Sequence, residues 1–584
     1  MTDQFPAIAE RILVADRVRT MDAGERPALT GERAAVAIAA GRILAVGSPA
    51  DLEALRGPAT EEIDLGAATI VPGLTDSHTH VALGLDMTLG IQLTDVGPLA
   101  EIDRRVSEAA RAAAPGEWVL GWGLDPNVFA ETGFTGVRFD AVTGETPMAL
   151  TMRDGHSMIV NSAALRAAGV DGPVEFTDES AVGLDADGRP NGYLVEFQAT
   201  QLVTSAIPAE PFEQRVERLR RVLDGFASTG IASTHVLDFA PGTEELVRTI
   251  EETGELPVRL RFSPWVEAGA TRDDLETIAA LQGRGGRRWS VEGVKLFIDG
   301  TIDNGSAWLR EPDAYGQGTD SVWSDPADYA AAVAFFAERG IPTATHAIGD
   351  RGVEYALEAI GAAIGGSGSG AVAGRGSAAV ADAGTVAAVA AVVDAAADAG
   401  AVPAAGPRAV HRIEHIETIP DELVARFAEL GVVASMQPVH GTHHTRADRT
   451  DNWSVRLGEE RAAHGWRCRD LREAGVTVAL GSDWPITPYD PRAMMADSIL
   501  RRPVERPGTA PVQPEQALTP RMALEGYTTH AAAAAGLSAV AGSIAPGKRA
   551  DLTVFAADPL EASAEELART PIVATVVDGQ VILR

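Results

Sequence analysis

Apolar runs of strand length recur through the middle of the chain, and the stretches between them are long enough to hold helices. Eight such runs occupy residues 68–78, 231–237, 257–265, 291–299, 341–349, 411–417, 432–438 and 476–484. Helical periodicity precedes two of them, over 212–230 and 328–340, and both segments end in glycine, as helix C-caps often do. This alternation of strands and helices predicts an α/β protein with a (β/α)₈ barrel of the TIM type.

Both ends of the chain have a different pattern, in which short apolar strands alternate with turns of Gly, Pro and Asp. Such strands are expected within residues 10–20, 34–47, 61–73, 542–559 and 572–584. We expect the two ends to pair into a small composite β-sandwich domain formed by residues 1–72 and 540–584. The barrel domain would then span residues 73–539.

Two insertions interrupt the alternation inside the predicted barrel. Residues 95–200 are too many for a loop between a strand and a helix, so we expect them to form a cap over the barrel mouth. Residues 364–407 are rich in Gly, Ala and Ser and cannot bury much apolar surface. This second insertion is predicted to be a flexible loop without a role in chemistry.

Composition and charge indicate which classes of ligand the protein can bind and where in the cell it is expected. The 584 residues are 45% hydrophobic and carry a net charge of −33, which would repel a dense array of phosphates and so argues against nucleic-acid binding. The first residues lack a secretory signal and no strongly apolar run is long enough to span a membrane. A cytoplasmic protein with a small-molecule substrate is expected. With Cys468 as the single cysteine, any bound metal must be held by His and carboxylates.

A His-x-His pair, His78 and His80, lies at the end of the first apolar run. Alternate residues of a strand point to one side and can bind one cation, although surface or packing histidines are an alternative explanation. Polar residues recur at the same place in later runs, namely Lys295, His346, His415 and Asp483. Active sites of (β/α)₈ barrels are built in this way, from the ends of several strands.

The motifs around these residues resemble those of the amidohydrolase superfamily. VPGLTDSHTH resembles its first-strand signature, and GSDWP resembles the segment that contains its eighth-strand aspartate. The strings MRDGHSMIVNSAAL, VKLFIDGT, THAIGDRG, RIEHIE and SMQPVH are similar to the branch that includes N-substituted formamide deformylase. The resemblance extends over nearly the whole chain, apart from the Gly- and Ala-rich insertion.

The resemblance implies a binuclear site that holds one or two divalent metal ions. His78 and His80 would bind the more buried ion, and His346 and His415 the second. Lys295 would bridge the ions as a carbamate derived from CO₂, whereas a pair with Asp299 is the alternative for this lysine. Zinc is the first expectation, and manganese, iron or cobalt fit the same nitrogen and oxygen ligands.

The same resemblance assigns the catalytic proton transfer to Asp483. This aspartate would bind metal weakly, take a proton from a metal-activated hydroxide and pass it to the leaving amine. The alternative is a turn or N-cap residue before Pro485. The implied activity is hydrolysis of a C–N bond in an amide, formamide or related small molecule.

Further candidates for substrate contact come from the cap and from other strand ends. They are Trp122, Arg153, Asp154, His156, Asn161, His235 and His440. Turn and capping hydrogen bonds explain the cap residues equally well, and packing is an alternative for Trp122 and His235.

Two other functions stay open from the sequence. The same metal site could act on an ester, lactone, carbamate or phosphate, and a degenerate barrel could serve as a non-catalytic binding protein. A complete ligand set argues against the degenerate barrel. Barrels of this type commonly dimerise, so a homodimer is one assembly that we consider, without predicted interface residues.

Overall fold

The parallel strands at the centre of the fold lie in two sheets. The computed structural model describes residues 8–22, 30–94, 96–129, 132–176, 180–365 and 409–583. One sheet consists of β6 (Leu74–Thr79), β13 (Ile231–Val236), β14 (Arg259–Phe262) and β16 (Trp289–Val291). The other consists of β15 (Trp265–Val266), β17 (Val294–Phe297), β18 (Thr343–Ala347), β19 (Arg412–His415), β20 (Val433–Met436) and β21 (Val478–Leu480). Each of the eight apolar runs contains all or nearly all of one of these strands, whereas β16 lies almost entirely before the fourth run and β15 begins at the last residue of the third.

The two parallel sheets are connected at both sides. The chain passes directly from β14 into β15, and from β16 into β17, so that each of these pairs joins the two sheets. At the other side, the end of β6 lies beside the segment that follows β21, where the backbone N–H of Asp483 donates to the carbonyl oxygen of His78 over 2.7 Å. The strand pairings of the described residues thus give a TIM-barrel-like α/β fold in two sheets, without a closed ring.

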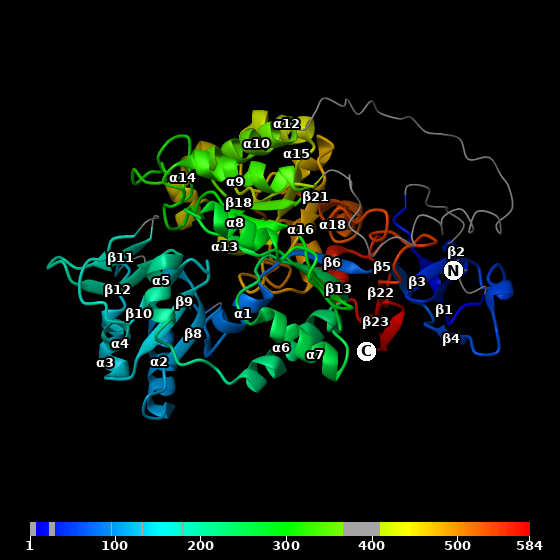
Figure 1. The fold of residues 1–584 in the computed structure, drawn as a ribbon, viewed down its shortest axis with the longest axis horizontal. Helices are drawn as coiled ribbons and strands as arrows, with labels where there is room; N and C mark the ends of the chain where they lie inside the picture. Colours follow the sequence, from blue (N-terminus) through cyan, green and yellow to red (C-terminus); the bar gives the residue numbers. More distant parts are fainter. Residues whose placement is uncertain are drawn as a thin grey trace.

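Helices pack on the outer side of these strands. They include α6 (Phe212–Ser228), α7 (Thr243–Thr253), α8 (Arg272–Ala279), α9 (Pro326–Glu338), α10 (Asp350–Gly365) and α12 (Asp421–Leu430) (Figure 1). Helix α9 begins where the Asp325 side chain accepts a hydrogen bond from the N–H of Ala327. It buries Tyr329 and Phe336 in the core beside β18. Burial of such aromatic side chains is worth about 1.5–3 kcal/mol each.

Strands from both ends of the chain form one sheet. Its order is β24-β23-β22-β5-β1-β2-β3, with β4 paired to β1, and β22 (Leu552–Phe555) runs antiparallel to β5 (Thr69–Pro72). Figure 1 shows the amino-terminal strands in blue beside the carboxyl-terminal strands in red. The other members are β1 (Arg11–Val18), β2 (Thr30–Ala39), β3 (Arg42–Gly47), β4 (Glu61–Asp64), β23 (Ile572–Val577) and β24 (Gln580–Leu583). The predicted second layer of a sandwich stays a prediction.

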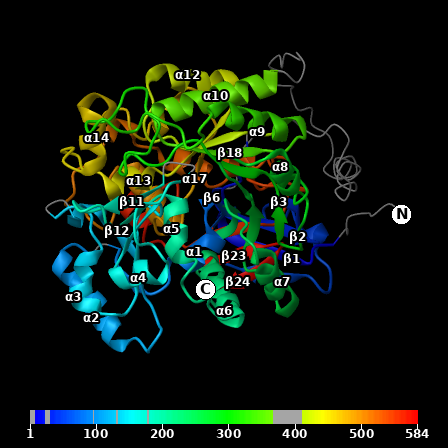
Figure 2. The same ribbon diagram turned by 60° about the vertical axis from the view of Figure 1, so that its left-hand side comes forward.

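The segment predicted to cap the barrel has a sheet of its own, in the order β11-β12-β10-β9-β8-β7. We call residues 91–204 the cap; Figure 2 shows it at lower left. Its strands are β7 (Ile91–Gln92), β8 (Val119–Leu124), β9 (Met148–Met152), β10 (Ser157–Val160), β11 (Ala181–Leu184) and β12 (Pro190–Val195), and its helices include α2 (Leu99–Ala112), α4 (Ser162–Ala167) and α5 (Phe197–Thr204).

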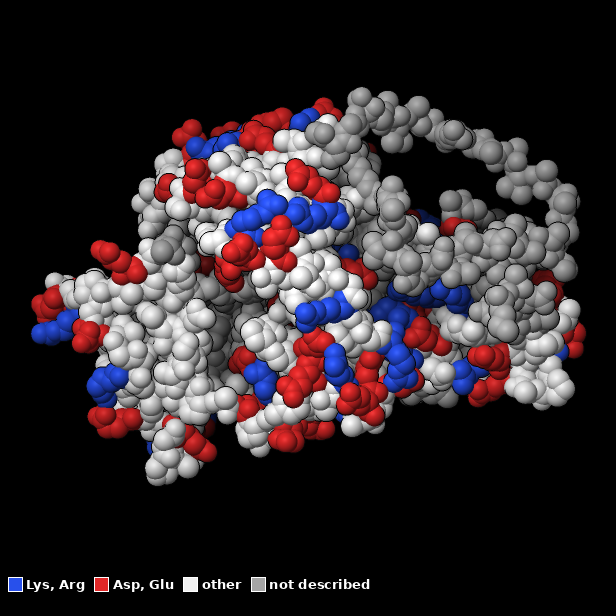
Figure 3. Space-filling model, in the orientation of Figure 1, with Lys and Arg blue, Asp and Glu red and all other residues white. Residues whose placement is uncertain are grey.

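Three further features concern membrane-spanning helices, surface charge and the second predicted insertion. No helix in the described part of the chain is long and apolar enough to cross a bilayer. Figure 3 shows acidic and basic side chains interspersed on one face. Of the insertion predicted over residues 364–407, all but the first two residues lie outside the described residues.

Candidate metal centre and active site

Polar side chains from five strands converge at the carboxyl ends of the parallel sheets. The side chains are those of His78 in β6, Lys295 in β17, His346 in β18, His415 in β19 and Asp483 after β21. Each of these residues is at most 5% exposed. His80, directly after β6, is 8% exposed. Burial of so many polar groups costs free energy unless they pair with one another or bind a cation.

Asp483 lies at the centre of this group. Its Oδ1 is 3.3 Å from Nε2 of both His78 and His80, yet it accepts no hydrogen bond from any described residue although it is buried. Ligand atoms of His78, His415 and Asp483 all lie within 4.8 Å of one another. Burial lowers the pKa of His78 and of His415 well below the ordinary value, which favours the neutral imidazole that binds metal. The donor set therefore fits a divalent cation.

Lys295 is fully buried in the same place. Its Nζ has no hydrogen-bond partner among the described residues, and burial lowers its pKa to about 8. The carboxylate of Asp299, the alternative partner, instead accepts the backbone N–H groups of Ile348 and Gly349 at 3.0 and 2.8 Å. A buried amine with a lowered pKa is uncharged more readily than an exposed lysine.

The orientation of His78 is set by a carboxylate that the sequence did not indicate. Nδ1 of His78 donates to Oε2 of Glu414 over 2.7 Å, while Nε of Arg412 lies 2.7 Å from Oε1. With Nδ1 engaged, Nε2 of His78 faces Asp483. A carboxylate behind a ligating histidine fixes the tautomer and makes the imidazole a better ligand.

His415 and His346 also have a hydrogen-bond partner on one ring nitrogen. Nδ1 of His415 lies 3.0 Å from Oε1 of Gln437, and Nε2 of His346 lies 3.1 Å from the carbonyl oxygen of Gly300. Glu414 and Gln437 were missed by sequence reasoning. Only their position beside the motif residues His415 and Pro438 could have drawn attention to them.

An unusual backbone conformation at His415 explains why the side chains of both Glu414 and His415 face the site. His415 has φ of 72° and Asp483 has φ of 56°, conformations that are uncommon for residues other than glycine. A regular strand would direct Glu414 and His415 to opposite faces. The left-handed conformation at His415 turns the chain at the end of β19 and allows both side chains to contact the site. Such conformations cluster at functional sites.

A cavity of about 80 Å³, which we call the catalytic chamber, is lined by four of the candidate metal ligands, His80, His346, His415 and Asp483. Its wall includes His80, Asp154, His156, Phe197, Trp265, Phe297, Asp303, His346, His415, Glu417, His440 and Asp483. Glu417 was not predicted; burial raises its pKa to about 8, and it accepts a hydrogen bond from Nε1 of Trp453 over 2.8 Å.

Three of the predicted substrate-contact residues line the catalytic chamber. Nε2 of His440 lies 3.8 Å from Oδ2 of Asp483 and has no hydrogen-bond partner among the described residues. Nδ1 of His156 donates to Oε2 of Glu196 over 2.8 Å. Asp154 accepts the N–H of His156 and so shapes the turn that presents it. His440 and His156 are thus able to contact a ligand.

The other four lie away from the chamber wall. Arg153 pairs with Asp125 at 3.1 Å, and Asn161 caps α4 by accepting the N–H of Ala164. His235 contacts Arg412 through Nδ1 at 2.9 Å, and Trp122 is packed in β8 at 3% exposure. The hydrogen bonds of Asn161 and His235 and the packing of Trp122 favour structural roles for these residues. Substrate contact by all four stays a prediction.

Comparisons with known proteins reveal extensive similarity. The model of the Amidohydrolase family matches residues 61–380 and 371–583. Protein LONG AFTER FAR-RED 3 of Arabidopsis thaliana is 26% identical over 93% of this chain and 87% of its own length. N-substituted formamide deformylase of Arthrobacter pascens is 24% identical over 97% of each chain.

Similarity also extends to solved structures. An uncharacterized metal-dependent hydrolase from Pyrococcus horikoshii OT3 superposes with a TM-score of 0.66 at 20% identity, covering 95% of this chain and 99% of that one. At this identity the likeness concerns the fold alone.

Proposed function

The chain belongs to the Amidohydrolase family, whose model matches nearly its whole length, and from that premise we propose a metal-dependent hydrolase that cleaves a C–N bond in a small molecule. The observation that carries the proposal is Oδ1 of Asp483, a buried acceptor that receives no hydrogen bond from the described residues and lies 3.3 Å from Nε2 of both His78 and His80. A buried carboxylate oxygen in such surroundings needs a cation. The relative named N-substituted formamide deformylase supports a C–N bond as the target.

The proposed metal ligands are the residues that converge on Asp483. His78 and His80 would hold one ion, His346 and His415 a second, with Lys295 and Asp483 next to both. Zinc suits this set of nitrogen and oxygen donors, and one or two ions per chain are compatible with it. When bound, such an ion lowers the pKa of water toward 7 and polarises a carbonyl group.

Lys295 would contribute an oxygen ligand after carboxylation. The neutral amine attacks CO₂, a new N–C bond forms, one proton leaves, and the product is a carbamate anion. Support comes from the buried Nζ, which has no hydrogen-bond partner in the described part of the chain, and from its lowered pKa. An ammonium group would repel the ions, whereas a carbamate supplies two oxygens to a site that is rich in imidazole.

Asp483 would move the proton during turnover. Its carboxylate would accept a proton from the attacking water and deliver it to the leaving nitrogen, because Asp483 lines the catalytic chamber in which the scissile bond would bind. His440, at 3.8 Å from the same carboxylate, has an Nε2 without a hydrogen-bond partner among the described residues, and this nitrogen would donate to the carbonyl oxygen or the leaving group. His156 would contact the substrate from the cap.

We also propose that the two parallel sheets form one (β/α)₈ barrel. The bridge between Thr79 and Trp484 supports closure, because it joins the first and last strand segments. The barrel domain would comprise residues 73–539, and the sheet formed by the two ends would belong to a separate domain.

A hydrolysis screen tests the proposal. N-formyl and N-acyl amines, esters, lactones and carbamates are incubated with zinc-loaded protein, and released amine or acid is quantified. Release of amine that stops after chelation and returns with zinc supports a metal-dependent C–N hydrolase. Release from esters or lactones alone would contradict the C–N assignment, and no turnover by loaded protein would favour a binding protein.

Substitution of Glu414 by Gln is expected to weaken metal affinity by about 10–100-fold, the usual cost of losing a partner behind a metal ligand. The amide keeps the size of the side chain but removes the charge that makes His78 a better ligand. Chelator competition measures the change in Kd for zinc. The control is Glu292→Gln, which alters a pair with Arg261 elsewhere; equal affinity in both variants would contradict the role of Glu414.

A further inference from the structure

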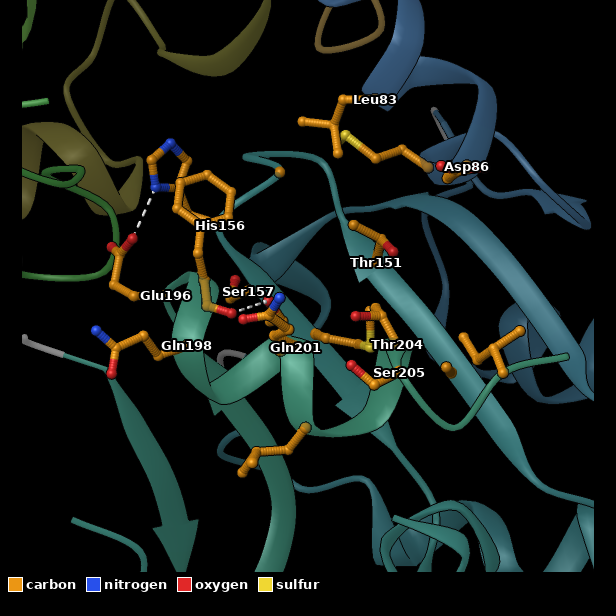
Figure 4. A pocket seen from close by; sticks show the side chains of 18 of the residues that line it. Leu83, Asp86, Thr151, His156, Ser157, Glu196, Gln198, Gln201, Thr204 and Ser205 are labelled. Atoms are coloured by element: carbon orange, nitrogen blue, oxygen red, sulfur yellow. Dashed lines mark hydrogen bonds and ion pairs between the residues drawn. The ribbon is translucent and has the colours of Figure 1, made fainter. Parts of the chain in front are cut away.

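A second and much larger cavity lies between the cap and the barrel strands. We call it the outer cavity; its volume is about 1060 Å³. Figure 4 shows part of its wall, which includes Thr151 in β9 and Gln201, Thr204 and Ser205 in or next to α5. The volume is at the upper end of the range of about 300–1,000 Å³ that is typical of small-molecule sites. Of the residues given a role in catalysis or substrate contact above, His156 alone lines this space.

The outer cavity adjoins the catalytic chamber. The two cavities share seven wall residues: Leu83, Met87, Gly155, His156, Phe197, Trp265 and Phe297. Ring centroids of Phe197 and Trp265 lie 5.2 Å apart, and those of Trp265 and Phe297 lie 4.9 Å apart. His156 contacts Phe197 at 4.8 Å. These four rings form an aromatic neck between the two spaces.

The chamber alone is too small for most substrates. Its volume of about 80 Å³ is roughly half that of a cavity of about 150 Å³ that holds one benzene molecule. The reacting carbonyl group and the attacking water would fill it. A substrate whose scissile bond reaches Asp483 must therefore place any larger substituent across the neck and into the outer cavity.

The wall of the outer cavity exposes more apolar than polar surface, although Thr, Ser, Gln and acidic side chains also line it. Its apolar members include Leu83, Leu120, Ala149, Met158, Phe176, Leu202 and Ile207. Two of its charged members already have partners, because Asp86 lies 2.9 Å from Arg215 and Glu210 lies 2.7 Å from Arg218. An uncharged apolar or aromatic group gains most from such surroundings.

We propose that the outer cavity is the specificity site of the enzyme. It would hold an uncharged aromatic or branched apolar substituent of the substrate, while the chamber admits only a small group, such as formyl or acetyl, on the other side of the scissile bond. The inference rests on the proposed function and extends it to the two sides of the scissile bond. The group on one side, the small half of the substrate, lies in the chamber, and the group on the other side, the large half, lies in the outer cavity. The aromatic neck selects for a flat or slender connection between them.

A substitution that fills the outer cavity tests this division. Thr151 lines the outer cavity but not the chamber, so Thr151→Trp adds bulk where the large half would lie. The measured quantity is the ratio of kcat/KM for N-(2-phenylethyl)formamide to that for N-methylformamide. We expect this ratio to fall by more than about tenfold, the lower bound for a misfit in an apolar pocket. Thr204→Trp fills the same cavity from α5. This second variant keeps the test valid if Thr151→Trp fails to fold.

The control variant is Thr277→Trp, on an exposed position of α8 that lines neither cavity. It should leave the ratio within twofold of wild type. An N-methyl amide of 3-phenylpropanoic acid places the phenyl group on the acyl side instead, and comparison of the two phenyl substrates reveals which half enters the outer cavity. An unchanged ratio in both filling variants would overturn the proposal.

A binding measurement shows whether the outer cavity accepts the large substituent even if the chain hydrolyses no amide. It therefore tests this inference independently of the proposed function. Calorimetry with N-(2-phenylethyl)acetamide is performed on zinc-loaded chain that has Asp483→Asn, so that the ligand is not consumed. Binding that Thr151→Trp weakens by more than about tenfold supports the outer cavity even if no amide is hydrolysed. Absence of binding to the chain without Thr151→Trp would overturn the inference, whether or not small amides are cleaved.

Discussion

Asp483→Asn is expected to lower kcat by about 10²–10⁴-fold, the range over which general acid–base catalysis contributes. The amide has nearly the same shape as the carboxylate and keeps one oxygen that can face a cation, but it has no basic oxygen to accept a proton from water. Because the backbone at residue 483 has φ of 56° and is fixed by the hydrogen bond of its N–H to His78, the side chain should stay in place.

The measurement pairs steady-state kinetics with elemental analysis of the same samples. Asp497→Asn is the matched control, because Asp497 is also a buried aspartate, paired with His443 at 2.7 Å away from the chamber wall. It should keep kcat near that of wild type. Full activity in Asp483→Asn would refute its role in proton transfer, and an equal loss in both variants would attribute the effect to folding.

Lys295→Ala is expected to lose metal and, with it, nearly all turnover. Removal of a ligand should weaken binding by more than the about 10–100-fold that loss of an outer partner costs. Alanine also leaves space beside His346 and His415, since the amine that it replaces is fully buried. Acetate or propionate can enter that space and supply the two oxygens of the missing carbamate, so partial recovery of metal and activity is expected.

Chelator competition and activity assays in increasing acetate concentrations measure these effects. Lys548→Ala is the control, because Nζ of Lys548 donates to the carbonyl oxygen of Ser538 in the carboxyl-terminal part of the chain, away from the metal-binding residues. It should keep its metal and show no response to acetate. Unchanged metal content in Lys295→Ala would rule out the bridging role.

The strands of the fold could be predicted because their signal is local. Each apolar run contains its own evidence of burial, and a polar residue such as His346 near the end of β18 marks the functional edge of the sheet. Lys295 was expected at a strand end as well, but it is the second residue of the four-residue strand β17. The sequence also predicted that both ends of the chain form strands, and β22 does pair with β5. Closure of the parallel strands into a ring depends on tertiary geometry, which periodicity cannot supply.

The partners behind the metal-binding residues could not be predicted, because they meet only in three dimensions. Glu414 contacts His78 across 336 residues of sequence, and the turn that allows it depends on positive φ at His415. Cap residues illustrate a second limit: Asn161 stands before a helix, where an N-cap and a ligand contact leave the same local pattern, and the structure has it capping α4.

The central claim is that these buried side chains hold metal, and metal content per chain tests it most directly. Protein purified without chelator is compared by elemental analysis with the His78→Ala/His80→Ala double variant. About two equivalents of divalent metal are expected in the wild-type protein, as in binuclear hydrolytic sites, and their loss is expected in the variant. No bound metal in the wild-type chain, even after zinc, manganese, iron and cobalt are supplied, would contradict it.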